Sequence, residues 1–207
     1  MSAKSQVPVE GHGESRRSLR RDALTNQERV LAAAVTTMLR EGRHVPMATI
    51  AAEAGVGVAT LYRRYPNRET LLSALTHRAF ELLLEQARAA EARDETALAC
   101  LSWWWDRVID QRDQLVLPLG GGPPVTNTQT LAAQSQLHQS LQRLLERGQG
   151  EGSIRDDITT HDVVIFGAML VTPLPSTKDW DRTARRQKQI YLDGLAPSPT
   201  QHHKLTL

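Results

Sequence analysis

The chain has 207 residues, of which 40% are hydrophobic and 23% charged, enough for one or two small domains with a buried core. Its longest apolar stretch, Val163 to Val171, is about half of what a membrane helix needs. The N-terminus lacks an apolar signal-peptide core, so we expect a cytoplasmic protein. A single cysteine, Cys100, excludes an internal disulfide and a multi-cysteine metal site.

Positive charge is concentrated in the first third of the chain. Residues 1–70 hold eleven Lys and Arg against seven Asp and Glu, a formal charge of +4, whereas the remaining residues sum to −2. A basic segment ahead of a slightly acidic one is typical of an N-terminal nucleic-acid-binding domain followed by a neutral domain. A solvated basic tail explains part of the imbalance. Arginine makes up 21 of the 25 basic residues, which suits contacts with phosphate and guanine, although a GC-rich genome explains the same bias equally well.

Residues 1–24 are rich in Ser, Gly, Pro and charge and have no apolar period, which predicts a disordered tail. The tail ends in a cluster of four arginines: Arg16, Arg17, Arg20 and Arg21. This cluster is either an arm that follows the minor groove of DNA or a solvated tail.

Order is expected to begin at Thr25, because Thr25 and Glu28 fit the capping box of a helix start. Apolar pairs recur every four residues along this first helix, and Gly42 is expected to end it. Pro46 suits the first turn of a second helix, which Gly55 stops after about two turns.

The rest of the chain also reads as helices, without a strand pattern, so the expected class is all-α. Helices are predicted over residues 58–64, 67–93, 96–110, 128–148, 160–171 and 178–193. A loop marked by glycine and proline is expected over 115–125, Gly194 is expected to end the last helix, and residues 196–207 are expected to form a frayed tail.

Residues 47–64 have the pattern of a helix-turn-helix, whose second helix enters the major groove of DNA. Gly55 can adopt the left-handed backbone conformation that the turn requires. Val56, Leu61 and Tyr65 are expected to anchor the short second helix inward. The outer face or its leading edge then consists of Gly57, Val58, Ala59, Thr60, Tyr62, Arg63 and Arg64. Hydroxyl and guanidinium groups there can reach phosphates and base edges, and Val58 and Ala59 can touch a thymine methyl.

The segment I-A-A-E-A-G-V-G-V-A-T-L-Y-R-R-Y-P-N-R-E-T-L, residues 50–71, resembles the DNA-binding domain of the tetracycline-repressor (TetR) family. The resemblance covers about residues 25–72 and implies a homodimeric transcriptional repressor. It implies three N-terminal helices that bind DNA and a C-terminal bundle of about six helices that holds a ligand and the dimer interface. The expected parts are a basic tail at 1–24, the helix-turn-helix domain at 25–70, the ligand-binding and dimerisation domain at 71–195 and a flexible tail at 196–207.

The resemblance also implies roles for single residues. Thr60 and Tyr62 match the phosphate-contacting pair of the family, and Arg68 stands where the family usually has a phosphate-contacting lysine. Three positions depart from a common serine, glycine and histidine of the family and bear on base preference: Gly57, Ala59 and Arg64. Arg63 and Arg64 are the candidates for guanine readout, with phosphate contact as the alternative.

Beyond residue 72 the resemblance is architectural, with a weak further likeness at 152–162 to the turn before the penultimate helix of many members. The helices at 160–171 and 178–193 would pair with their twins in a four-helix homodimer interface. Apolar side chains on them support this expectation: Val164, Phe166, Met169, Leu170, Trp180, Ile190 and Tyr191.

Trp103, Trp104 and Trp105 are the most prominent candidates for ligand binding. Three consecutive helical residues cannot face one way, so at least one is expected to be partly exposed or to line a pocket. Phe166 and Met169 are candidates on the same argument, and core packing is the alternative for all five. An aromatic-lined cavity favours a flat or apolar ligand.

These patterns predict a ligand-responsive repressor that releases a near-palindromic operator when a small apolar or aromatic molecule binds. The alternative is a DNA-binding protein of the same fold that has no small-molecule ligand and is controlled by a protein partner. Acids and histidines do not cluster at ligand spacing, and no nucleotide-binding glycine loop or nucleophile motif is present. We therefore expect no catalytic residue, no metal and no cofactor.

Overall fold

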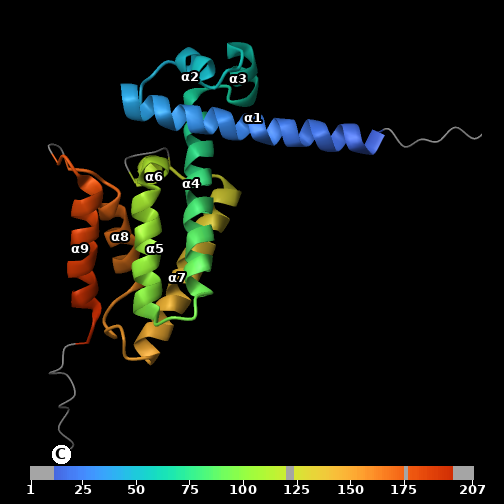
Figure 1. The fold of residues 1–207 in the computed structure, drawn as a ribbon. Helices are drawn as coiled ribbons and strands as arrows, with labels where there is room; N and C mark the ends of the chain where they lie inside the picture. Colours follow the sequence, from blue (N-terminus) through green and yellow to red (C-terminus); the bar gives the residue numbers. More distant parts are fainter. Residues whose placement is uncertain (1–11, 120–123, 175–176, 198–207) are drawn as a thin grey trace, which may run out of the picture. The chain divides into compact units, whose positions relative to one another are not determined.

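The structure is a computed structural model. It describes the backbone of residues 12–119, 124–174 and 177–197, and the side chains of residues 25–115, 124–174 and 177–197. These residues form helices and no strand, which confirms the all-α class (Figure 1). The helices of the described part are α1 (His12–Glu41), α2 (Met47–Glu53), α3 (Val58–Arg64), α4 (Arg68–Glu91), α5 (Ala97–Asp110), α6 (Arg112–Leu119), α7 (Thr128–Gly150), α8 (Thr160–Leu170) and α9 (Trp180–Leu195).

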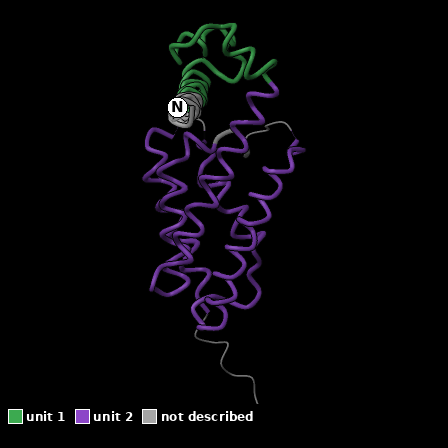
Figure 2. The backbone as a smooth tube through the Cα atoms, turned by 90° about the vertical axis from the view of Figure 1, so that its right-hand side faces the viewer, with its two compact units in different colours: residues 1–68 green, residues 69–207 purple. Residues whose placement is uncertain are grey.

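The chain divides into two compact units, Met1–Arg68 and Glu69–Leu207, coloured separately in Figure 2. The first unit contains α1, α2 and α3. The second contains α5 to α9 and all of α4 after its first residue, Arg68. The helix-turn-helix segment and the expected bundle therefore fall into different units.

The core of the first unit is built by all three of its helices. Its buried apolar side chains include Val30, Leu31, Ala34, Met38, Ile50, Ala51, Leu61 and Tyr65. Those of α1 recur every three or four residues, which places them on one stripe of the helix. Gly42 follows α1 with a φ of 91°, and its amide donates to the carbonyl of Met38 at 2.9 Å, so α1 ends where a left-handed glycine is expected to end it.

The expected start of order was wrong. Helix α1 begins at His12, so residues 12–24 are helical, and Thr25 lies inside the helix rather than at its cap. The segment lacks proline and contains four Arg and two Leu, which are strong helix formers, so a helix held by packing after Thr25 can extend through it. Residues 1–11 of the predicted tail, and the side chains of the arginine cluster at 16–21, lie outside the described part.

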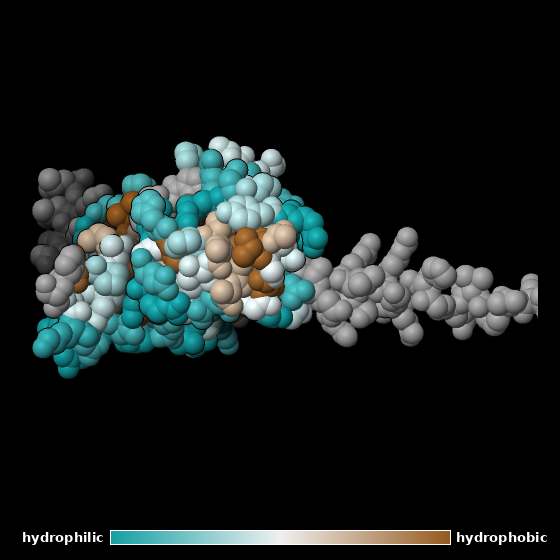
Figure 3. Space-filling model, turned by 90° about the horizontal axis from the view of Figure 1, so that it is seen from above, coloured by the Kyte–Doolittle hydropathy of each residue, from teal (hydrophilic) through white to brown (hydrophobic). Residues whose placement is uncertain are grey.

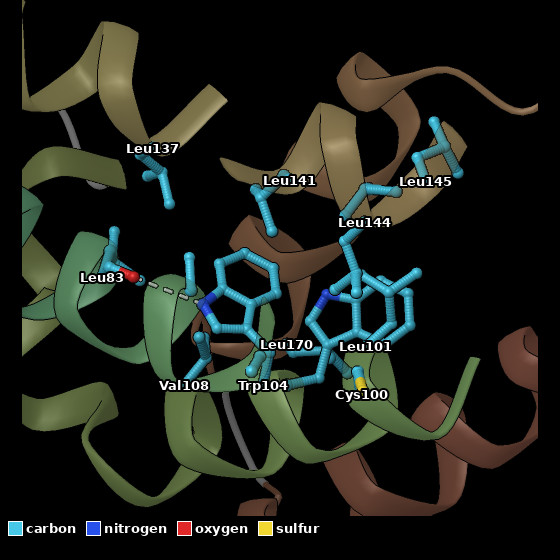
Figure 4. Close-up of a cluster of buried hydrophobic side chains, with 14 of the residues drawn as sticks. Leu83, Cys100, Leu101, Trp104, Val108, Leu137, Leu141, Leu144, Leu145 and Leu170 are labelled. Atoms are coloured by element: carbon cyan, nitrogen blue, oxygen red, sulfur yellow. Dashed lines mark hydrogen bonds between the residues drawn. The ribbon is translucent and has the colours of Figure 1, made fainter. Parts of the chain in front are cut away.

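Helix α5 supplies much of the core of the second unit and packs against α6, α7, α8 and α9. Its buried side chains include Cys100, Leu101, Trp104, Trp105 and Val108. Figure 4 shows Trp104 among leucines of α7, with its indole nitrogen directed to the carbonyl of Leu83 on α4. Each fully buried large apolar side chain contributes roughly 1.5–3 kcal/mol, so this cluster is the main stabilising feature of the unit.

Polar caps set the starts of four helices in the second unit, and that of α9 is Asp179, whose side chain accepts from the Arg182 amide at 3.2 Å. The Thr96 hydroxyl accepts from the Ala99 amide at 3.3 Å before α5. Asn127 accepts from two amides of α7, and Thr159 forms a capping box with Asp162 at the start of α8. Such caps satisfy amides that have no partner within the helix, so these boundaries follow from local sequence.

The loop expected over 115–125 begins later than predicted, because α6 continues to Leu119. Leu115 is fully buried, and its packing holds this short helix, which the sequence pattern did not reveal. The glycine and proline cluster at 120–123 lies outside the described part.

The expected end of the last helix also needs correction. Helix α9 passes through Gly194 and ends at Leu195, which is buried, and the carbonyl of Leu195 accepts from the Arg155 amide at 2.9 Å. Packing of the final leucine outweighs the modest cost of a helical glycine. Residues 198–207 of the predicted tail lie outside the described part.

Candidate nucleic-acid interface

The turn between α2 and α3 is held by backbone hydrogen bonds and by one arginine of α1. Gly55 has a φ of 64°, and the amide of Val56 donates to the carbonyl of Ala51 at 3.0 Å. Nη2 of Arg29 donates to the carbonyl of Ala54 at 2.8 Å. A Cβ at position 55 would lie 3.1 Å from that Nη2 atom, so both the backbone angle and Arg29 favour glycine here.

Sequence reasoning missed this role of Arg29. Its carbonyl partner lies 25 residues along the chain, and no local pattern marks such a contact. Local patterns did mark Gly55, because a glycine between two short helices is a turn signal in itself.

Helix α3 is anchored by the residues expected to point inward. Leu61 is 1% exposed and Tyr65 is 4% exposed, while Val56 is half-buried. The carbonyl of Gly57 accepts from the amides of Thr60 and Leu61 at 2.9 and 3.1 Å and starts the helix. A helix of seven residues is not stable alone, so this packing is what maintains α3.

The opposite face of α3 is open to solvent. The seven residues expected on it are all exposed: Gly57, Val58, Ala59, Thr60, Tyr62, Arg63 and Arg64. At 100° per residue, Ala59 and Arg63 lie within about 20° of the direction opposite Leu61. The view from above shows mainly hydrophilic side chains around a smaller apolar area (Figure 3).

This face is positively charged. Residues 57–64 contain two arginines and no acidic residue, and residues 25–68 as a whole contain six Arg against three Glu. Two of those glutamates are already paired, because Arg40 lies 2.9 Å from Glu41 and 3.0 Å from Glu53. An exposed cationic helix face suits the phosphate backbone of DNA.

The two arginines of α3 have different surroundings. Nη2 of Arg64 donates to Oε1 of Gln27 on α1. The side chains of Arg64 and Gln27 line a hollow of about 340 Å³ between α1 and α3. Arg63 and apolar residues such as Val30 and Leu61 also line it. Arg63 points closer to the outward direction of α3, whereas Arg64 lies at the edge next to α1. Gln27 carries no local signal for this role, since its partner is 37 residues away.

Tyr65 also lines this hollow. Its hydroxyl is buried and has no hydrogen-bond partner among the described residues. Burial raises the pKa of this hydroxyl above its ordinary value, so the phenol stays neutral and keeps its proton at physiological pH.

The structure places Arg68 differently from the other expected contact residues. It is half-buried at the start of α4, and its guanidinium lies on three backbone carbonyls of the loop between α1 and α2. Nη1 donates to Arg43 at 2.8 Å, and Nη2 donates to Val45 and, at 3.4 Å, to His44. The side chain expected on phosphate is thus engaged within the protein.

The three tryptophans expected near a ligand point in different directions. Trp105 is fully buried, and its ring meets those of Phe166 and Tyr191 edge to face at 5.3 and 5.5 Å. Trp104 is buried and donates to the carbonyl of Leu83 at 3.4 Å. Trp103 lies on a different side of helix α5 from Trp104 and Trp105, so the three side chains do not share one site.

Trp103 is half-buried and has two arginines near its ring, with Arg93 4.9 Å and Arg107 5.8 Å from the centroid. Phe166 stacks on Tyr191 at 3.8 Å, whereas Met169 is 63% exposed. Of the five expected residues, the structure brings Trp105 and Phe166 into contact, whereas Trp103 and Met169 do not join this aromatic cluster. Tyr191, which joins the aromatic cluster from α9, was not singled out as a ligand candidate because its neighbours are brought to it only by folding.

Two further hollows of the second unit involve α8. One, of about 660 Å³, is lined by polar residues of α7 and the start of α8: His138, Gln139, Gln142, Arg143, Thr160 and His161. Another, of about 330 Å³, lies between α8 and α9 and includes Phe166, Ile190 and Tyr191. Ile165, Met169 and Ile190 are large apolar side chains left exposed on these two helices.

Two classes of site find no support in the described part of the chain. None of its helices combines the length and apolar character needed to cross a membrane. Among the same residues, no three His, Cys, Asp or Glu side chains are grouped so that they could hold a metal ion.

Two family profiles match the chain. The profile described as "Bacterial regulatory proteins, tetR family" matches residues 30–75, and the one described as "Transcriptional regulator SbtR-like, C-terminal domain" matches residues 119–197. Comparison with curated proteins gives no match.

Solved structures share the fold over most of the chain. The TetR transcriptional regulator SCO0520 from Streptomyces coelicolor is 28% identical, with a TM-score of 0.61 over 83% of this chain and 99% of that one. A TetR transcription regulatory protein from Mycobacterium vanbaalenii is 27% identical, with a TM-score of 0.62 over 86% and 99%. AibR, solved in complex with isovaleryl coenzyme A and operator DNA, is 16% identical and shows the fold alone, with a TM-score of 0.63 over 83% and 98%.

Proposed function

Since the chain belongs to the TetR family of bacterial DNA-binding transcriptional regulators, which are not enzymes, we propose that it is a ligand-responsive repressor. It would act as a homodimer on a near-palindromic operator. The observation that carries this proposal is the exposed face of α3, which contains two arginines and no acidic residue and is held outward by buried Leu61 and Tyr65.

On this proposal each part of the face has its own role. Thr60 and Tyr62 donate to phosphates, and Arg63 reads guanine because it lies closest to the outward direction. Val58 and Ala59 contact thymine methyl groups. The proposed contact residues of α3 are Gly57, Val58, Ala59, Thr60, Tyr62, Arg63 and Arg64. Arg64, held at the edge by Gln27, then serves a flanking phosphate.

We propose that α8 and α9 form the homodimer interface. Ile165, Met169 and Ile190 are 47%, 63% and 51% exposed on these helices, and the hollow between them has an apolar lining. A second copy related by a two-fold axis would cover these side chains with the same surface. Its α3 would then reach the next major groove, about 34–36 Å away along the duplex.

The effector would bind in the second unit. The edge-to-face and stacked rings of Trp105, Phe166 and Tyr191 support an apolar or aromatic molecule. AibR was solved with both isovaleryl coenzyme A and operator DNA, so the shared fold can accommodate a small molecule and DNA. Effector binding would favour a spacing of the two α3 helices that no longer matches the operator, as a shift between pre-existing states.

Selection from a random duplex library tests the proposal. The protein should enrich an inverted repeat with half-sites about one helical turn apart, and its affinity for that duplex should fall steeply with salt. Equal binding of the enriched and unselected duplexes would refute a sequence-specific repressor.

The second candidate function keeps the DNA-binding head but replaces the small molecule by a protein partner. Two observations favour this candidate. The hollow between α7 and α8 is lined by polar residues, and the five expected ligand residues do not share one site. A thermal-shift screen with apolar and aromatic small molecules separates the two. Stabilisation by one of them, with release of the enriched duplex, supports the effector; no stabilisation, together with a co-purifying protein, supports the partner.

A further inference from the structure

We propose that Arg68 is a positioning residue for DNA binding, which acts on the protein's own backbone and does not hold a phosphate of the operator. This inference rests on the proposed function, because it concerns how α3 is presented to DNA. It departs from the phosphate contact that the resemblance implied for this position.

The loop between α1 and α2 has few means of its own to keep its shape. It leaves α1 through Gly42 in the left-handed region, and its main internal bond runs from the Val45 amide to the Gly42 carbonyl at 3.2 Å. Pro46 then starts α2 without a side-chain cap. The carbonyls of Arg43, His44 and Val45 lie in this loop, outside the regular hydrogen bonding of a helix, and are acceptors that a side-chain donor can bind.

Arg68 provides that donor. Its two terminal nitrogens reach all three carbonyls, with Arg43 at 2.8 Å, His44 at 3.4 Å and Val45 in the closest contact of the three. A guanidinium stays charged at all relevant pH values and presents its donors in a flat fork, so one side chain can serve several acceptors. Hydrogen bonds from a charged donor are also stronger than neutral ones.

The loop sets the position of α2, and α2 supports α3. Val45 is buried directly before α2, and Met47 and Ile50 are buried in its first turn. Helices α2 and α3 pack on each other and are joined by the Gly55 turn. A loop that loses its three bonds to Arg68 thus loosens the support of the outward face of α3.

Salt dependence distinguishes this role from a phosphate contact. Each phosphate neutralised by a basic side chain adds about 0.9 to the slope of log K against log salt concentration. A residue that only positions α3 changes the affinity at every salt concentration and leaves the slope as it was. Arg64, which is proposed to serve a flanking phosphate, provides the comparison.

The experiment uses the full chain and the duplex enriched from the random library. Dissociation constants are measured from 50 to 300 mM KCl, about the range in which counterion release is resolved, at a temperature where circular dichroism shows every variant fully folded. We expect Arg68→Ala to raise Kd about tenfold with an unchanged slope. Arg68→Lys should not restore affinity, because one ammonium group cannot replace the fork. Arg64→Ala should lower the slope by about 0.9.

Hydrogen exchange provides a readout that needs no DNA. The amides of Val45, Thr49 and Ile50, which bond within the loop and the first turn of α2, should exchange faster in Arg68→Ala and Arg68→Lys than in Arg63→Ala. Met38→Ala, which removes a buried side chain of α1, is the control for general destabilisation. It should lower the melting temperature and leave Kd unchanged while the protein is folded.

Four outcomes would overturn the proposal. The first is a salt slope that falls by about 0.9 in Arg68→Ala and returns to the wild-type value in Arg68→Lys. The second is an unchanged Kd in Arg68→Ala, and the third is unchanged exchange of the three amides. The fourth is a rise of Kd in Met38→Ala equal to that in Arg68→Ala. If Arg68→Ala does not fold, Arg68→Gln takes its place. If the wild-type chain enriches no duplex, the proposed function fails, while hydrogen exchange still decides whether Arg68 holds the loop.

Discussion

Gln27 on α1 accepts a hydrogen bond from the guanidinium of Arg64 on α3, so two arginines adjacent in the chain occupy different places at the candidate interface. Arg64 lies at the edge of α3, beside the hollow between α3 and α1. Arg63 lies nearly opposite buried Leu61 and points outward. The sequence treats the two as equal candidates for guanine, and the contact with Gln27 separates them.

Replacing the two arginines should therefore have different effects. Arg63→Ala should lose about 1–3 kcal/mol of discrimination at one base pair of each half-site, because a bidentate guanine contact is removed. Arg64→Ala should weaken all sequences alike and lower the salt slope by about one. Selection from the random library with each variant measures both effects. Gln27→Ala, which frees Arg64, should alter the sequence preference only when Arg64 is present. The opposite pattern for Arg63 and Arg64 would reverse their assignment to guanine and phosphate.

Gly55→Ala should destabilise the protein by about 1–2 kcal/mol, since an alanine there must adopt a positive φ. The new Cβ would also press on Nη2 of Arg29 at 3.1 Å. Gly57→Ala is the matched control, because Gly57 has a φ of −66° and an added Cβ would meet its nearest atom, the Thr60 hydroxyl, at 3.8 Å. Urea denaturation followed by circular dichroism should show a lower midpoint for the first variant alone. Equal midpoints would mean that the turn does not require glycine.

Met169→Glu should convert the homodimer into a monomer, because it would bury a charge in the proposed interface of α8 and α9. Loss of the dimer should weaken binding to the inverted repeat by at least about tenfold, as each copy then holds a single half-site. Leu131→Glu changes a comparably exposed leucine on α7 and should leave the dimer intact. Analytical ultracentrifugation measures the assembly. A dimer that survives Met169→Glu and Ile190→Glu would place the interface elsewhere.

Glu91 should contribute stability that depends on pH. Hydrogen bonds from Arg143, at 2.6 and 2.9 Å, hold the pKa of this carboxyl below its ordinary value of 4.5. A group with a lowered pKa in the folded state stabilises the protein above its unfolded pKa, and this stability is lost as the pH falls through the folded pKa. Acidification from pH 7 into that range should lower the melting temperature of the wild type more than that of Glu91→Gln. Equal losses in both proteins would show that the pair contributes nothing.

Local sequence determined most of the helices and the general character of the site. Apolar periods placed α2, α3, α5, α7 and α8 close to their observed bounds, and the glycine between two short helices marked the turn at Gly55. The inward residues Leu61 and Tyr65 followed from the same period. The assignment of individual residues of α3 to bases or phosphates stays a prediction.

Local sequence failed where packing overrode a local signal. A capping pattern at Thr25 lies inside α1, buried Leu115 belongs to a short helix in an expected loop, and buried Leu195 carries α9 through Gly194. In each case the local preference is of the order of 1 kcal/mol, and extension or burial of neighbouring residues outweighs it.

The sequence by itself determined that this protein has a helix-turn-helix head with a cationic outer face, because helix period, glycine turns and charge are local properties. Only the tertiary structure decided what three arginines of that head do. Arg29 binds the turn at Ala54, Arg64 binds Gln27, and Arg68 binds the loop after α1. Their partners lie 23 to 37 residues away along the chain. An arginine has the same charge and reach wherever it stands, so the carbonyl or side chain that folding brings within hydrogen-bond distance determines whether it faces DNA or the protein's own backbone.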